Sequence, residues 1–338
     1  MNIIFNQGYN IVEAMNKYNL MRGLIAIWII LGHCSMEFEK EILPLYLIHK
    51  FNLVWVGVFF FLSGWGLEIS NVTKKNYLKG FLLKKTISII GMTVKVWIFG
   101  ILILTLVGKN YNFYFLELLK NYFFSTNWYM WELLFFYYLY YLTTKYIQNS
   151  KIRLYVIFII CLCIVMLLPF TGIKPAYYFS CLGFPVGIFS YHNRERIQNC
   201  FKRYPVKILL ILMMISFLCT LSLLLPQKNS ISALGKNIMC ISVALMGVIL
   251  FMNFSLEARS LKFLSMISPQ LYLYQFPILT FFRIIWKRNI RAIGIDYVIV
   301  VTVTTIIISS LVYLVEEVYK NQRKNKVQRI AFHDYKTK

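Results

Sequence analysis

The chain has 338 residues, of which 59% are hydrophobic and 14% are charged, and its formal net charge is +23. A soluble domain of this length could not bury so much apolar surface, so the composition excludes an ordinary soluble protein and predicts several membrane spans. The positive charge does not indicate nucleic-acid binding, because the basic residues lie in short stretches between apolar segments. The seven cysteines, an odd number without a Cys-x-x-Cys spacing, predict buried apolar side chains and neither disulfides nor metal ligands.

The apolar segments predict an all-α integral membrane protein, a bundle of about ten transmembrane helices in one domain over residues 1–338. Each segment is close to the length that crosses about 30 Å of hydrocarbon. With the N-terminus inside, 24 of the 36 Lys and Arg residues fall on the cytoplasmic side and 11 outside. The positive-inside rule then predicts that both termini, including a basic tail at 316–338, are cytoplasmic. The segments are 20–37, 52–70, 86–108, 127–147, 154–170, 176–191, 207–225, 233–252, 264–285 and 296–315.

The first segment carries two ionisable residues on one side of a helix. Arg22 and His33 are eleven residues apart, which is almost three turns at about 3.6 residues per turn. Ionisable residues within a span normally face a bundle interior or a wet cavity, so this stripe predicts a polar path through the membrane. Glu37 lies four residues beyond His33 and is expected to reach it and orient it. The alternatives are that Arg22 is a plain cytoplasmic anchor and that His33 is an interfacial histidine satisfied by water.

The second segment contains the run FFFLSG at 59–64. An arginine and a histidine with this spacing on the first span, followed by FFFLSG on the second, resemble the membrane acyltransferase-3 family. The resemblance implies that Arg22 and His33 are the functional pair, and that an acyl group, usually acetyl, passes from a cytoplasmic coenzyme A thioester to a hydroxyl of a surface or exported glycan. Ser63 is not expected to be a nucleophile, because the Gly-x-Ser-x-Gly elbow is absent. The glycines of this segment predict close helix packing.

The loop 71–85 holds five lysines, which a positive-inside loop by itself explains. The family has an arginine-rich stretch here that is assigned to donor binding, and Lys84 and Lys85 are the nearest matches. The loop itself contains no arginine, although lysine can hold phosphate as a point charge. The resemblance thus implies that Arg22, Lys84 and Lys85 contact acetyl-CoA.

Two more charged residues lie within predicted spans, Lys95 in the third and Glu132 in the fourth. Each is costly alone in lipid, so they are expected either to pair or to line one cavity. The fourth span begins Trp-Tyr-Met at 128–130, which loosely resembles the family's start to this span.

The ninth segment opens SPQLYLYQFP, which resembles the family pattern Ser-x-x-x-Tyr-Leu-x-His-x-Pro at Ser268, Tyr272, Leu273 and Pro277. Gln275 stands where the family has histidine, and glutamine cannot titrate. His33 is therefore expected to act alone as general base on the acceptor hydroxyl.

These observations predict a bacterial, multi-pass cell-membrane O-acetyltransferase. The resemblance implies acetyl-CoA as donor substrate and a capsular, O-antigen or other exported polysaccharide as acceptor, and neither a metal nor a nucleic acid is expected. Two other functions stay open. A glycan flippase or transporter predicts inverted repeats, and no clear repeat is visible. A polysaccharide polymerase predicts a large outside platform, whereas the outside loops are short.

Overall fold

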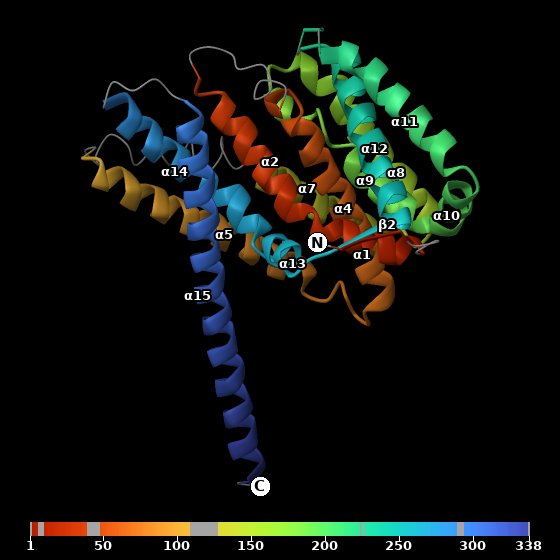
Figure 1. Cartoon of the computed structure of the whole chain (residues 1–338). Helices are drawn as coiled ribbons and strands as arrows, with labels where there is room; N and C mark the ends of the chain where they lie inside the picture. Colours follow the sequence, from red (N-terminus) through yellow and green to blue (C-terminus); the bar gives the residue numbers. More distant parts are fainter. Residues whose placement is uncertain are drawn as a thin grey trace.

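The computed structural model describes residues 2–5, 10–38, 48–108, 128–223, 225–226, 228–288 and 294–336. The described helices pack into one bundle, from which the C-terminal helix projects (Figure 1). The longer helices are α1 (Ile11–Leu20), α2 (Arg22–Ser35), α4 (Asn52–Thr73), α5 (Phe81–Leu106), α7 (Trp128–Tyr146), α8 (Ser150–Leu167), α9 (Gly183–His192), α10 (Arg194–Arg203), α11 (Pro205–Thr220), α12 (Ser230–Asn253), α13 (Arg259–Met266), α14 (Ser268–Arg288) and α15 (Ile295–Lys336). Three single 3-10 turns are η2 (Leu168–Phe170), η3 (Pro175–Tyr177) and η4 (Leu221–Leu223).

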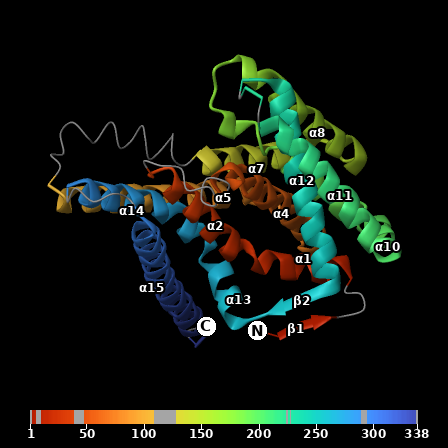
Figure 2. The same ribbon diagram turned by 45° about the horizontal axis from the view of Figure 1, so that its top comes forward.

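Two short strands qualify the all-α prediction. Strand β1 (Asn2–Phe5) pairs antiparallel with β2 (Phe254–Glu257), which connects α12 to α13. The pairing ties the N-terminal end of the chain to a segment more than two hundred residues later. In Figure 2 this small sheet lies at the edge of the bundle, beside α13.

The part of the chain that the structure describes supports only some of the predicted membrane spans. Among the described residues, five helices are long and apolar enough to cross a membrane, and α10 with α11 could form a sixth, broken span. Each of the ten predicted segments overlaps a helix, but about ten spans is not confirmed. Helices α2 and α9 have only 14 and 10 residues, which is short of the roughly 20 that cross the hydrocarbon core. The five are Ile48–Thr73, Phe81–Leu106, Ser150–Phe170, Ser230–Asn253 and Ile295–Gln322.

The bend between α10 and α11 has a local cause. The two helices meet at 103°, and α11 begins at Pro205. A proline disfavours the helical conformation of the residue before it, and Tyr204 accordingly has φ −137° and ψ 52°. The basic residues of α10 therefore run in a different direction from the apolar α11.

Helix α4 lies at the centre of the bundle and packs most closely against α9. A Cβ atom added to Gly64 would overlap the carbonyl oxygen of Phe184, and one added to Gly187 would overlap that of Phe61. The predicted close helix packing at the second-segment glycines is thus confirmed at Gly64, while Gly66 faces open space.

Helix α2 is held by similar close approaches at both of its ends. Gly23 abuts the backbone of Leu264 in α13, and Gly32 abuts the side chain of Asn52 in α4. Its most extensive contact is with α14, followed by its contact with α13. These contacts fix the positions from which Arg22 and His33 project.

Candidate active site

Three neighbouring cavities lie along α2. The histidine cavity has a volume of about 330 Å³ and includes His33 in its wall. The central cavity, about 200 Å³, shares Tyr272 with the histidine cavity. The basic cavity, about 390 Å³, shares Arg22, Ser63 and Lys85 with the central cavity. The shared walls place the three cavities in series, with lysines at one end and His33 at the other.

His33 is held by a glutamine from α14. Its Nδ1 lies 2.9 Å from Oε1 of Gln275, and the amide Nε2 of Gln275 donates to the carbonyl oxygen of Tyr272 at 2.7 Å. The amide oxygen of Gln275 can only accept, so Nδ1 of His33 carries the proton in this pair. A neutral imidazole then has its free lone pair on Nε2, which is the atom that can take a proton.

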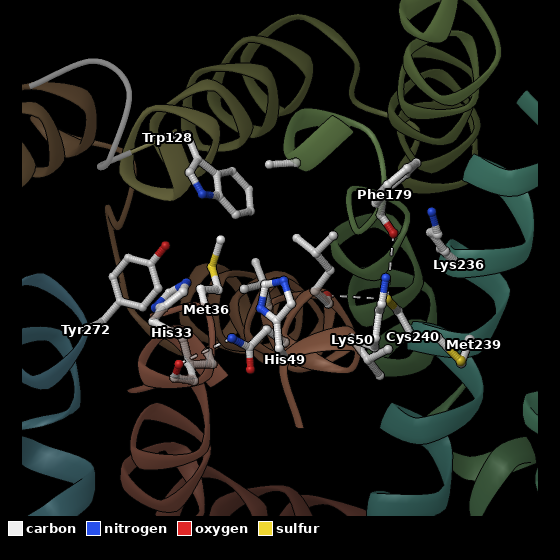
Figure 3. Close-up of a pocket in the computed structure, with 16 residues that line it drawn as sticks. His33, Met36, His49, Lys50, Trp128, Phe179, Lys236, Met239, Cys240 and Tyr272 are labelled. Atoms are coloured by element: carbon white, nitrogen blue, oxygen red, sulfur yellow. Dashed lines mark hydrogen bonds between the residues drawn. The ribbon is translucent and has the colours of Figure 1, made fainter. Parts of the chain in front are cut away.

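The histidine cavity is formed by several helices that are far apart in sequence (Figure 3). His33 comes from α2, Trp128 from the start of α7 and Tyr272 from α14. His49 and Lys50 come from the helical segment just before α4. Cations and aromatic rings thus share this cavity.

The basic cavity collects cations from α2, from the connection before α5 and from α5 itself. Lys74, Lys84, Lys85 and Arg22 line it, and its described lining residues include no carboxylate. Gly80 adopts φ +69° at the start of α5, which turns the chain so that Lys84 and Lys85 fall in the first turns of that helix. Such a group of unneutralised cations favours an anionic ligand.

Two further residues of the basic cavity, Arg22 and Tyr77, show what kind of ligand group it can bind. Nε of Arg22 is buried without a hydrogen-bond partner among the described residues. Tyr77 lines the same cavity from the connection between α4 and α5, and burial raises the pKa of its phenol, which therefore stays neutral. The cavity offers hydrogen-bond donors and positive charge together.

Two tyrosines separate the two ends. The rings of Tyr129 and Tyr272 lie 4.8 Å apart, and both residues line the central cavity. Phe59, the first residue of the FFFLSG run, contacts Tyr129 with ring centroids 6.1 Å apart. The junction between the ends is therefore aromatic.

A family model described as an acyltransferase domain matches residues 15–314, which include every helix that lines the three cavities. The chain belongs to the family 3 acyltransferases. No curated protein and no solved structure matches the chain with significance. The protein is thus a membrane acyltransferase, and the three cavities lie within its acyltransferase domain.

Six of the predicted site residues of the acyltransferase line these cavities. Arg22, Ser63, Lys84 and Lys85 line the basic cavity, while His33 and Tyr272 line the histidine cavity. A seventh, Gln275, lies behind His33 as its hydrogen-bond partner and is fully buried.

Glu37 does not orient His33. Helix α2 ends at Ser35, so the helical spacing of four residues does not extend to Glu37. Its carboxylate instead lies 3.1 Å from Nε of Arg283 in α14. Glu37 therefore neutralises Arg283, and Gln275 takes the place beside His33.

Lys95 and Glu132 do not pair, and they share none of the cavities given for the described residues. Lys95 forms an ion pair with Glu316 of α15 and its side chain is about half exposed. Glu132 is 5% exposed, and neither of its carboxyl oxygens has a hydrogen-bond partner among the described residues. Lys95 belongs to α5 and Glu132 to α7. The cost of a charge in lipid predicts that each residue needs a favourable environment, but it does not predict which residue it meets.

A buried ionic cluster was not predicted from the sequence. Glu68 of α4 lies 2.5 Å from a guanidinium nitrogen of Arg153 in α8 and accepts a hydrogen bond of 2.7 Å from Tyr140 in α7. His192 of α9 lies 3.0 Å from the same carboxylate. The cluster ties four helices together near one end of the bundle. A glutamate inside the second segment was the available signal, because such a residue requires a partner.

Proposed function

We propose that this membrane acyltransferase is an O-acetyltransferase that moves an acetyl group from cytoplasmic acetyl-CoA to a hydroxyl of an exported polysaccharide. The observation that carries the proposal is the series of cavities, with four cations at one end and a histidine at the other. The basic cavity suits the phosphates of coenzyme A, and the histidine cavity suits a sugar hydroxyl.

The donor enters from the basic cavity in this proposal. Arg22, Lys84 and Lys85 bind the phosphates, with Arg22 at the entrance to the central cavity. The thin acyl-bearing arm of coenzyme A extends through the central cavity past Tyr129. The thioester then reaches the junction at Tyr272, which lines both the central and the histidine cavities.

His33 acts as general base in the transfer. Its Nε2 takes the proton of the acceptor hydroxyl as the hydroxyl oxygen attacks the thioester carbonyl. The new ester C–O bond forms, the C–S bond breaks, and the coenzyme A thiolate leaves with its electron pair. Gln275 holds the Nδ1 proton and keeps Nε2 available throughout. A positioned base of this kind contributes about 10²–10⁴-fold to a rate.

The test uses inside-out membrane vesicles that carry the full chain together with its native glycan, supplied with radiolabelled acetyl-CoA. The measured quantity is alkali-labile label in the glycan. His33→Gln keeps hydrogen bonding but cannot titrate, so labelling should fall about 100-fold or more at unchanged protein abundance. Full labelling by a well-expressed His33→Gln protein would overturn the proposal.

The donor end is tested in the same vesicles by varying acetyl-CoA. Lys85→Gln should raise the KM for acetyl-CoA about tenfold, because a charge-assisted hydrogen bond to phosphate is worth about 1.5–3 kcal/mol. Lys75→Gln is the matched control, since Lys75 lies in the same stretch, is exposed and lines none of the three cavities. Equal KM values for the two variants would remove the basic cavity from donor binding.

A further inference from the structure

The histidine cavity has a positively charged wall. Lys236 of α12 lines it from the side opposite His33, and Lys50 lines it between the two (Figure 3). His49 also faces the cavity, whereas its described lining residues include neither aspartate nor glutamate. General base catalysis on a neutral sugar would not require this charge.

Lys236 is the key residue of this wall. It lies within a helix that is long and apolar enough to span the membrane, and it is only 7% exposed. Its Nζ lies 3.6 Å from the centroid of the Phe179 ring, and among the described residues no carboxylate pairs with it. A buried ammonium without a counter-ion is costly, and one aromatic face offsets only part of that cost.

A ligand that brings a negative charge would supply the missing counter-ion. The cavity volume of about 330 Å³ lies within the range of small-molecule sites. His33 and Lys236 both line this one cavity, so a ligand that fills it lies between them.

We propose that the acceptor is an acidic sugar, whose carboxylate or phosphate binds Lys236 while its hydroxyl faces His33. This inference rests on the proposed function and names the class of acceptor that the same site takes. It also accounts for the location in this cavity of a lysine that has no carboxylate partner among the described residues, because a buried charge without a counter-ion destabilises a helix bundle.

The test measures binding without any donor, so acyl transfer does not enter. The purified full chain in lipid nanodiscs is titrated calorimetrically with a glucose trisaccharide, with the corresponding glucuronic acid trisaccharide and with the 6-phosphorylated glucose trisaccharide. At least one acidic trisaccharide should bind about tenfold tighter than the neutral one, as expected for one charge-assisted hydrogen bond. The two acidic probes distinguish a carboxylate ligand from a phosphate ligand.

Three variants localise the effect. Lys236→Met should reduce the preference for the acidic probe to about one, and Lys236→Arg, which keeps the charge, should retain it. Lys228→Met is the matched control, because Lys228 lies just before α12, is exposed and lines no described cavity. The unfolding temperature of each variant shows that it is folded.

Two outcomes would overturn the inference: equal affinity of the wild-type protein for neutral and acidic probes, or an acidic preference that survives in a folded Lys236→Met variant. Neither outcome bears on whether His33 catalyses acetyl transfer, which the vesicle labelling decides. Conversely, the binding of an acidic trisaccharide at Lys236 can be measured even if the protein proves not to be an acetyltransferase.

Discussion

At the scale of single residues, the main finding is the pair formed by His33 and Gln275. The direction of the Gln275 amide follows from its bond to the Tyr272 carbonyl, and that direction determines which nitrogen of His33 is free. Gln275 cannot titrate, but its hydrogen bond selects the tautomer of His33, which can titrate. The sequence comparison with the family could show only that a histidine was missing at this position.

This geometry leads to a prediction for Gln275. Gln275→Leu removes the acceptor for the Nδ1 proton, so His33 can turn and populate the other tautomer, and transfer should fall about tenfold or more. Gln275→Glu keeps an acceptor oxygen facing Nδ1 and should retain more activity than Gln275→Leu. The measurement is kcat from acetyl-CoA-dependent labelling of the glycan.

A merely structural role for Gln275 predicts something else. Both substitutions would then lower the unfolding temperature and the abundance of the protein in proportion to the lost activity. Equal kcat values for Gln275→Leu and the wild-type protein would show that the hydrogen bond does not position His33.

At the scale of elements, the contact between α4 and α9 holds α4, which contributes residues to all three cavities. Ser63 lies directly before Gly64 in α4, at one of the places where the backbones of α4 and α9 approach closely. The aromatic ring of Phe60 contacts Phe136 of α7, and Phe136 in turn stacks on Phe184 of α9 with centroids 4.7 Å apart. The FFFLSG run thus has two roles, since its phenylalanines pack in the core while its serine lines the central and basic cavities.

Because α4 and α9 pack so closely, adding one methyl group at their contact should destabilise the protein. Gly187→Ala places a Cβ atom on the carbonyl oxygen of Phe61, and a backbone atom cannot move aside as a flexible side chain could. Overpacking of this kind costs about 1–3 kcal/mol. The unfolding temperature in detergent should therefore fall clearly, and transfer activity should fall with it.

Gly66→Ala is the matched control, because nothing lies near a Cβ atom at that position. This variant should be neutral or slightly stabilising, since alanine exceeds glycine in helix propensity by about 1 kcal/mol. Indistinguishable unfolding temperatures for Gly187→Ala and Gly66→Ala would contradict the close packing of the two helices.

At the scale of the whole molecule, the two ends of the chain lie toward the same side of the bundle. Strand β1 and helix α1 lie at the lower edge in Figure 1, and α15 extends further in the same direction (Figure 1). Five crossings would place the ends on opposite sides of the membrane, whereas six, with the bent pair α10 and α11 as one span, would place them on the same side. The sequence-based prediction that both termini are cytoplasmic requires an even number of crossings.

The topology predicts the result of a reporter fusion. A reporter that is active only outside the cytoplasmic membrane, fused after Lys338, should give no signal, because the ten-span arrangement predicted from the sequence puts 24 of the 36 basic residues on the cytoplasmic side together with the C-terminus. A second reporter that is active only in the cytoplasm serves as the control and should be active. A strong outside signal would mean an odd number of crossings and would reverse the assignment of the donor to the cytoplasmic side.

The sequence by itself determined the features that depend on one helix at a time. Helical character follows from long apolar runs, and the shared face of Arg22 and His33 follows from the helical repeat of α2. The lysines of the stretch 71–85 and the FFFLSG run were recognisable because neighbouring residues in a chain remain neighbours in the fold. Family membership could be predicted for the same reason, since its motifs are short and local.

Only the tertiary structure decided which residues meet across helices. Glu37 pairs with Arg283, and Lys95 pairs with Glu316. The carboxylate of Glu132 has no hydrogen-bond partner among the described residues. Lys236 enters the histidine cavity through the packing of α12, although some two hundred residues separate it from His33. The physical reason is that a helix determines the directions of its own side chains, whereas the partner that each side chain meets depends on the crossing angle and separation of two helices. Small residues such as Gly64 and Gly187 set these quantities, and their effect appears only when the two helices are brought together.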